Sequence, residues 1–122
     1  MPGAVVRGLL VVLAVAVMAG CTVHYVTRAE RAYAEGRYLE VVEDLSSHEA
    51  DVPQLPVAKR ARFGLVLGLA LLELGDRQGA RQWLDDAEQL EALQPTLTPA
   101  QRQQLAAGRK ALAGEGKGTT SD

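Results

Sequence analysis

Apolar residues recur at helical spacing along most of the chain from residue 28 onward. The first clear stripe occupies positions i, i+3, i+4 and i+7, which is the pattern of an amphipathic helix with one buried face. Its members are Tyr38, Val41, Val42 and Leu45. A second stripe at helical spacing consists of Ala80, Trp83, Leu84, Ala87 and Leu90. Two helices, each with one apolar face, are therefore predicted on either side of a more apolar segment.

That central segment covers residues 56–74 and is apolar on more than one face in its second half. Such a pattern predicts a helix that packs against neighbours on several sides. A buried strand is the alternative, but the length of the segment and its leucine content favour a helix. The preceding residues 46–56 (SSHEADVPQLP) contain two prolines and break the helical pattern.

Capping signals mark the ends of the first helices. Thr27 and Glu30 fit a capping box, in which the two side chains satisfy backbone amides at the start of a helix. Gly36 and Gly75 can each end a helix in a left-handed conformation. These signals predict helical hairpins that turn at the two glycines.

A last, more polar helix is predicted over residues 98–112. Thr98 and Gln101 fit a second capping box, and Pro99 occupies the first helical position. Leu105 and Leu112 then lie one heptad apart. This helix can therefore present a narrow apolar stripe to the rest of the domain.

The first 20 residues have the pattern of an export signal. Arg7 and the free amine give a positive start, residues 8–19 (GLLVVLAVAVMA) carry no charge, and small residues follow. The run is too short for a membrane-spanning helix, which needs about 20 apolar residues. An uncleaved short anchor is the alternative interpretation.

Cys21 is the only cysteine and cannot form an internal disulfide bond. Ala19 and Gly20 before it resemble the lipobox of bacterial lipoproteins, with Met18 where leucine is more usual. The resemblance implies cleavage before Cys21, a diacylglycerol on its sulfur and an acyl chain on its new amine. Two or more acyl chains anchor a protein stably. A free exported thiol is the alternative.

The residue after the cysteine bears on which of the two bacterial membranes holds the protein. In the lipoprotein family an Asp there often signals retention in the inner membrane, and this chain has Thr22 instead. The resemblance therefore implies a lipid-anchored protein of the bacterial cell envelope that faces the periplasm, in the outer membrane rather than the inner.

The segments around Gly36 and Gly75 can be aligned as two copies of one helical hairpin. The second copy, residues 67–87 (LGLALLELGDRQGARQWLDDA), resembles the tetratricopeptide repeat (TPR), whose small and large positions let two antiparallel helices pack closely. The first copy, residues 28–45 (RAERAYAEGRYLEVVEDL), is a weaker match because Arg28 replaces the usual leucine.

Two aligned positions differ in size between the copies. Tyr25 aligns with Gly64, and His48 aligns with Ala87 where alanine is usual. The turn glycines are 39 residues apart (75 − 36), whereas the typical TPR period is about 34. The extra residues must lie in residues 46–56 or lengthen the next helix.

We therefore expect an all-α fold of the α-solenoid type, with two TPR-like hairpins and a C-terminal capping helix. About three repeats usually close a repeat core, so the capping helix, a second copy or a partner must supply the missing surface. The expected organisation is a signal peptide (1–20), a lipidated cysteine with a short tether (21–27), a TPR-like helical domain (28–113) and a disordered tail (114–122).

Composition and charge exclude some functions. The chain is 48% hydrophobic but only 4% aromatic, which favours helices over strands. The formal net charge is −2, and it becomes −3 when Arg7 leaves with the signal (−2 − 1). No global positive field therefore draws the protein to nucleic acid.

No group of residues has the spacing of a catalytic or metal site. The two histidines, His24 and His48, lack partners at metal-ligand spacing, and His48 at a helix end is better explained as a favourable charge there. Two carboxylate pairs lie off the apolar stripes, where solvent exposure explains them better than glycosidase chemistry. They are Glu43–Asp44 and Asp85–Asp86.

The remaining candidates are three arginines and one tryptophan. Acidic neighbours cancel much of the attraction that Arg77, Arg81 and Arg102 would have for an anion. Trp83 lies on an apolar stripe and is expected in the core. We therefore expect neither an enzyme nor a cofactor apart from the lipid on Cys21.

The expected function is recognition at a membrane. Helical hairpins can present a groove that binds a peptide or helix of another envelope protein while the acyl chains hold the complex in place. The alternative is a structural envelope subunit that associates with a second copy to complete its short repeat core.

Overall fold

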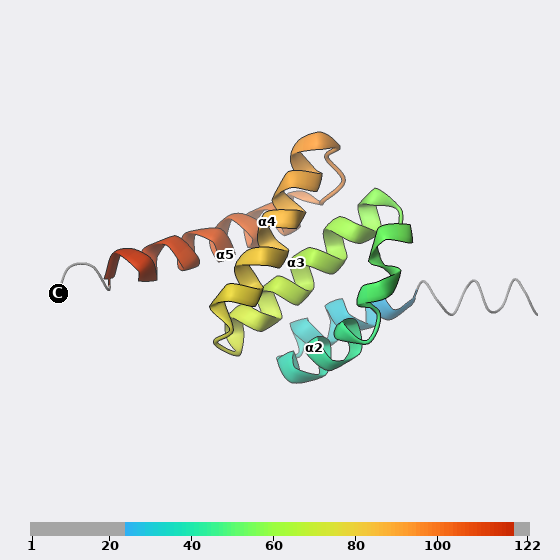
Figure 1. The fold of residues 1–122 in the computed structure, drawn as a ribbon, viewed down its shortest axis with the longest axis horizontal. Coiled ribbons are helices and arrows are strands. Elements are labelled where there is room, and N and C mark those ends of the chain that lie inside the picture. The colour runs from blue at the N-terminus through green and yellow to red at the C-terminus, as the bar shows by residue number, and fades with distance from the viewer. Residues whose placement is uncertain (1–23, 119–122) are drawn as a thin grey trace, which may run out of the picture.

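The computed structural model describes residues 24–118, and this part of the chain consists of helices without strands. A first helix covers residues 24–34, followed by α2 (Tyr38–Ser46) and a 3₁₀-helix, η1 (Glu49–Gln54). Three longer helices complete the domain, namely α3 (Val57–Glu73), α4 (Arg77–Leu93) and α5 (Pro99–Gly118) (Figure 1). The predicted all-α class is confirmed.

Each of two helical hairpins turns at a glycine in the left-handed conformation. The backbone angle φ is 79° at Gly36 and 88° at Gly75, in a region that other residues rarely adopt. At each turn the glycine N–H donates to the carbonyl three residues earlier, and the next N–H donates to the carbonyl five residues earlier. The two turns therefore share one hydrogen-bond pattern, and both glycines end helices as predicted.

Close packing of α3 against α4 depends on glycines in α3. A Cβ atom at Gly68 would lie 2.7 Å from Leu84 Cδ2 and 3.2 Å from the Leu84 backbone nitrogen. A Cβ atom at Gly64 would lie 3.1 Å from the Trp83 carbonyl oxygen. Residues four apart share one face of a helix, so these glycines form a single strip along which α4 approaches α3 closely.

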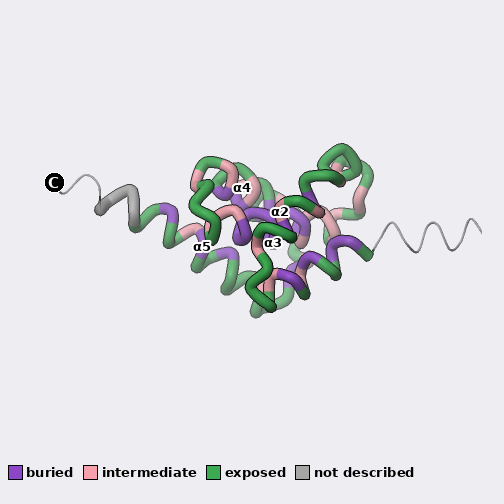
Figure 2. The backbone as a smooth tube through the Cα atoms, turned by 90° about the horizontal axis from the view of Figure 1, so that it is seen from below, coloured by how far each residue is buried: buried purple, intermediate pink, exposed green. Residues whose placement is uncertain are grey.

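The buried side chains form two clusters, and α3 contributes to both. The first cluster joins the helix of residues 24–34, α2 and α3. Its buried members are Tyr25, Val26, Ala29, Ala32, Val41, Leu45, Phe63, Val66, Leu67 and Ala70. The second joins α3, α4 and α5 through Ala61, Leu65, Leu69, Ala80, Leu84, Ala87, Leu97, Leu105 and Leu112. Figure 2 shows buried stretches facing the interior and exposed stretches outside.

Helix α5 covers a side of α3 and α4 that the hairpins leave open. Its capping box forms as predicted, because the Gln101 N–H donates to Thr98 Oγ1 at 3.1 Å and the Thr98 N–H donates to Gln101 Oε1 at 2.9 Å. Leu105 and Leu112 are both buried. Between them, a Cβ atom at Gly108 would lie 2.9 Å from Leu69 Cδ2, so α5 also packs closely.

The start of the first helix differs from the sequence-based expectation. Thr27 and Glu30 lie inside a helix that already includes His24, so they do not form an N-terminal capping box. Tyr25 and Val26 are only 2% and 1% exposed. Residues 24–27 therefore belong to the helical bundle, because their apolar side chains complete the first cluster.

Two other boundaries also differ. The proline-containing segment 46–56 includes the 3₁₀-helix η1, with Pro53 inside it, where only a break was expected. Its Val52 and Leu55 pack against the first cluster, which explains why the segment is ordered into a turn. At the other end, α5 continues to Gly118, beyond residue 113 where the helical domain was expected to end.

A candidate binding groove between three helices

The strongest candidate site is a groove between the helix of residues 24–34, α3 and α5, here called the three-helix groove. Its volume is about 220 Å³. It is lined by Glu30, Tyr33, Ala34, Arg62, Leu65, Val66, Leu69, Gln101 and Gln104. The first helix of each hairpin and the capping helix thus meet around one depression.

An ion pair joins two walls of this groove. The Arg62 Nε donates to Glu30 Oε2 at 3.0 Å, and Arg62 Nη2 pairs with the other carboxylate oxygen, so the contact is bidentate. The side chains are 25% and 27% exposed. The hydrogen bond to Glu30 raises the pKa of Arg62, and this effect exceeds the opposing effect of partial burial. The guanidinium therefore stays charged and fixed in place.

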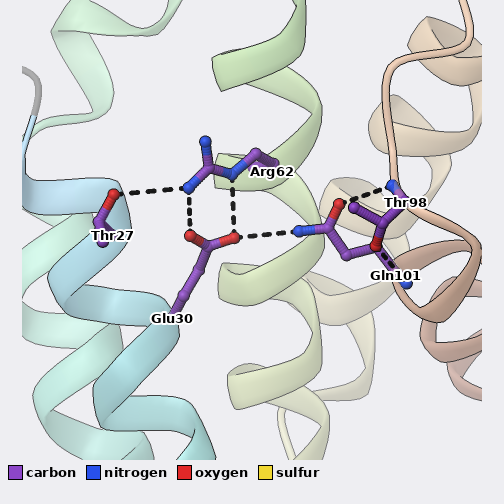
Figure 3. Close-up of polar contacts among 5 residues, drawn as sticks. All are labelled: Thr27, Glu30, Arg62, Thr98 and Gln101. Atoms are coloured by element: carbon purple, nitrogen blue, oxygen red, sulfur yellow. Dashed lines mark hydrogen bonds and ion pairs between the residues drawn. The ribbon is translucent and has the colours of Figure 1, made fainter.

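A third helix is tied to the same carboxylate. Gln101 Nε2 donates to Glu30 Oε2 at 3.2 Å, while its amide oxygen caps Thr98 at the start of α5. Arg62 Nη2 also reaches the Thr27 hydroxyl at 3.5 Å. Figure 3 shows these five side chains in one connected network across the three helices. The network holds the walls of the groove at a set separation.

The chemistry of the groove suits an apolar side chain with polar neighbours. Leu65, Val66 and Leu69 from α3 supply apolar surface, and the Glu30–Arg62 pair leaves no net charge beside it. A cavity of about 150 Å³ can hold a benzene ring. A groove of about 220 Å³ is therefore large enough for one aromatic or branched aliphatic side chain.

Of the other grooves on the described surface, two bear on how the domain could associate. The first, of about 380 Å³, lies between the helix of residues 24–34 and α2, and its rim includes Arg28, Glu40, Glu43 and Asp44. The second, the α4–α5 groove of about 520 Å³, is lined by Glu88, Glu91, Ala92, Arg102, Leu105, Ala106 and Arg109. The first combines its charged rim with the apolar Ala29, Ala32 and Val41, whereas the surface of the second is mainly apolar.

The candidate histidines do not meet. His24 is exposed at the start of the described chain. His48 follows α2 and stacks on Tyr25, with ring centroids 3.9 Å apart and planes 2° from parallel. Its Nδ1 also lies 3.3 Å from Asp51 Oδ2. His48 therefore packs against the first helix as well as standing near a helix end.

The acidic and basic candidates mainly make structural contacts. Asp85 pairs with Arg109 of α5, and Arg77 donates from Nη2 to the Leu112 carbonyl at 2.8 Å. Arg102 donates to the Leu97 carbonyl at 3.0 Å. Among residues 24–118, no cluster of three or more His, Cys, Asp or Glu side chains could hold a metal ion.

Trp83 is half-buried and packs on Phe63, with ring centroids 5.4 Å apart. It belongs to the edge of the first cluster, so the expectation of a core position is met only in part. Cys21, the predicted lipid attachment site, lies outside the described residues. No helix within residues 24–118 is both long and apolar enough to cross a membrane.

Sequence reasoning missed Arg62 altogether. The sequence predicts a local cap at Glu30, whereas its carboxylate pairs with Arg62, 32 positions later. The position of Arg62 directly beside the buried Ala61 and Phe63 was the one available signal, because a charge next to a packed face usually has a partner.

Comparisons with protein-family models, with curated proteins and with solved structures find no match to this chain.

Proposed function

We propose that this protein is a bacterial envelope lipoprotein whose helical domain binds a segment of another envelope protein in the three-helix groove. Acyl chains on Cys21 would anchor the protein in a membrane, with the helical domain facing the periplasm. The outer membrane is the proposed location. The observation that carries the proposal is the groove itself, with an apolar floor between walls fixed by Glu30, Arg62 and Gln101.

The proposal includes a TPR-like arrangement of the two hairpins. The aligned residues Ala29 and Gly68 are both small, and a Cβ atom at Gly68 would meet Leu84 of α4. The aligned Leu45 and Leu84 are both fully buried. Repeat proteins bind ligands on the surface formed by successive equivalent helices. In this domain those helices are the one over residues 24–34 and α3.

The two size differences between the copies compensate for one another. In the first hairpin, Tyr25 and His48 stack as a large pair. In the second, a Cβ atom at Gly64 would lie 3.6 Å from Ala87 Cβ, so a small pair occupies the aligned positions. Paired changes of this kind support a common origin for the two contacts, and they account for the departure of His48 from the usual alanine.

A groove-directed crosslink tests the function. A photoreactive residue at Ala34, which is exposed beside the groove, should crosslink to one partner in intact cells. Gln104→Arg should abolish this adduct because it fills the groove, whereas Gln103→Arg should not, because Gln103 is exposed on α5 outside the groove. An adduct that survives Gln104→Arg would count against the groove as the binding site.

A structural subunit that associates with itself is the second candidate. The α4–α5 groove favours it, because Leu105 and Ala106 leave apolar surface between two helices. In that case Ala106→Glu should reduce self-association in sedimentation velocity, and Ala107→Glu on the neighbouring exposed position should not. The absence of catalytic activity and of a cofactor remains a prediction.

A further inference from the structure

We infer that one end of the domain rests directly on lipid headgroups: the end formed by His24, η1 and the first turn of α3 (residues 57–60), here called the anchor-side end. The inference rests on the proposed acylation of Cys21. It goes further because it fixes which surface of the domain the membrane occupies and hence which surfaces remain free for a partner.

The first step concerns reach. Three peptide units separate Cys21 from His24, and a chain of that length spans at most about 11 Å even when fully extended. His24 already belongs to the first described helix, and the next two residues, Tyr25 and Val26, are buried. The helix therefore cannot unwind to lengthen the tether without exposing part of the first cluster.

The second step identifies what surrounds the attachment point. The ring of His48 stacks on Tyr25, one residue after His24, and η1 begins directly after His48. Val52 and Leu55 pack against the same cluster as Tyr25, and α3 starts at Val57. Figure 1 shows η1 and the start of α3 on the side where the first described helix begins. These segments are brought to the membrane together with His24.

The third step concerns what holds this end there. Glu49 and Asp51 are balanced by Lys59 and Arg60, so the anchor-side end has no excess of positive charge for anionic lipids. The exposed large hydrophobic side chains of the described chain are Leu39, Leu74 and Leu93, and none of them lies in η1 or in the first turn of α3. Contact with the membrane therefore depends on the acyl anchor and the short tether.

Energy transfer to labelled lipids tests the orientation. The full chain, made in bacteria and extracted from their membranes, is reconstituted in phosphatidylcholine vesicles that contain dansyl-labelled phosphatidylethanolamine. In a Trp83→Phe background, Ala50→Trp places the donor in η1, and Leu74→Trp places it at the far hairpin turn; both positions are exposed. Energy transfer to the dansyl lipid should be severalfold stronger from the tryptophan at position 50 than from the tryptophan at position 74.

A spacer variant is the matched control. Ten Gly and Ser residues inserted between Val23 and His24 add a flexible linker with a root-mean-square length of roughly 16–19 Å. The difference between positions 50 and 74 should then shrink toward none. Amine labelling of the unsubstituted protein gives an independent readout: vesicles should protect Lys59 relative to detergent, but not Lys110, which is exposed on α5.

The outcomes separate the two proposals. Mass spectrometry of the same sample establishes whether Cys21 carries acyl chains. An unmodified Cys21 would overturn the proposed lipoprotein function and this inference with it. An acylated Cys21 with equal transfer from the two positions, or with Lys59 labelled equally in vesicles and detergent, would overturn the inference alone.

Discussion

Glycines within helices set how closely the helices of this domain approach. Glycine in a helix costs up to about 1 kcal/mol relative to alanine, so its use in α3 and α5 needs a packing reason. Gly64, Gly68 and Gly108 have that reason, because an added Cβ atom would meet a neighbouring helix at 3.1 Å or less. Gly114, also helical, has open space around it.

Gly68→Ala should therefore destabilise the domain by about 1–2 kcal/mol, because overpacking against Leu84 exceeds the gain in helix propensity. Gly114→Ala is the control and should be neutral or stabilising by up to about 1 kcal/mol. Chemical denaturation followed by circular dichroism measures both. If Gly68→Ala were as stable as the natural protein, α3 and α4 could not pack as closely as described.

Glu91 stabilises the loop between α4 and α5 through its charge. Its Oε2 accepts from the N–H groups of Thr96 and Leu97 at 2.9 and 3.0 Å, and Arg102 lies 3.6 Å from Oε1. Burial raises the pKa of Glu91, but these hydrogen bonds and the charge of Arg102 outweigh it and leave the pKa below its usual value. The folded state therefore favours the carboxylate.

A lowered folded pKa means that the unfolded chain takes up the proton first as pH falls. The stabilisation by Glu91 should be complete above the unfolded value of about 4.3 and should disappear as pH falls through the folded pKa. At neutral pH, Glu91→Gln should lower the free energy of unfolding by about 1 kcal/mol, and this difference should vanish in acid. Glu88→Gln removes an exposed ion pair and should lower stability by less than Glu91→Gln does at neutral pH.

Cys21→Ser should prevent acylation and signal cleavage, because the sulfur is the proposed attachment site. The expected result is an unprocessed precursor without labelled fatty acid, seen by electrophoresis after metabolic labelling. A serine variant that matures to the normal size and stays in the membrane fraction after carbonate washing would contradict the lipoprotein proposal.

At the scale of elements, the same short motif has two outcomes in this chain. Thr98 and Gln101 form a capping box, whereas Thr27 and Glu30, with identical spacing, lie within a helix. Pro99 separates the two cases, because proline stops a helix from extending backward. Before Thr27, the apolar Tyr25 and Val26 gain more from burial in the first cluster than from ending the helix.

This contrast explains how much of the structure the sequence could predict. The hairpins, the long central helix and the helix that covers it follow from local spacing and turn glycines. The Glu30–Arg62–Gln101 network does not, because its members are separated by 32 and 39 residues (62 − 30 and 101 − 62) and meet only after α3 and α5 have packed. The walls of the groove were therefore beyond sequence reasoning.

A pair of alanine substitutions checks the two outcomes. Thr98→Ala should lower the free energy of unfolding by about 1 kcal/mol, because it leaves a backbone amide at the start of α5 without its cap. Thr27→Ala should change stability by less than about 0.5 kcal/mol, since alanine favours a helix interior and the lost contact to Arg62 is long. Thermal or urea unfolding distinguishes them. Equal costs at the two sites would contradict the difference between the two motifs.

At the scale of the whole molecule, the two outer sides of the helical array differ. The groove beside α2 is lined by the charged Arg28, Glu40, Glu43 and Asp44 together with the apolar Ala29, Ala32 and Val41. On the other side, α5 covers Leu69 and Leu84. Helix α5 therefore supplies apolar contact on the side of α3 and α4 that the hairpins leave open.

Removal of residues 97–122 should expose the apolar surface that α5 covers. We expect the shortened soluble domain, residues 22–96, to aggregate or dimerise in light scattering, and the intact soluble domain to be monomeric or weakly dimeric. Removal of residues 115–122 alone keeps Leu105 and Leu112 in place and should leave the domain unchanged. A stable monomer after the larger deletion would mean that α5 is free to reach a partner.

The shared position of α3 has a consequence for how the domain unfolds. Linear repeat arrays can lose terminal repeats one at a time, because each unit contacts only its neighbours. Here both clusters draw their side chains from α3, so neither can melt without exposing that helix. The two hairpins should therefore unfold in one cooperative step, and the amide hydrogens of α3 should exchange with solvent only when the whole domain opens.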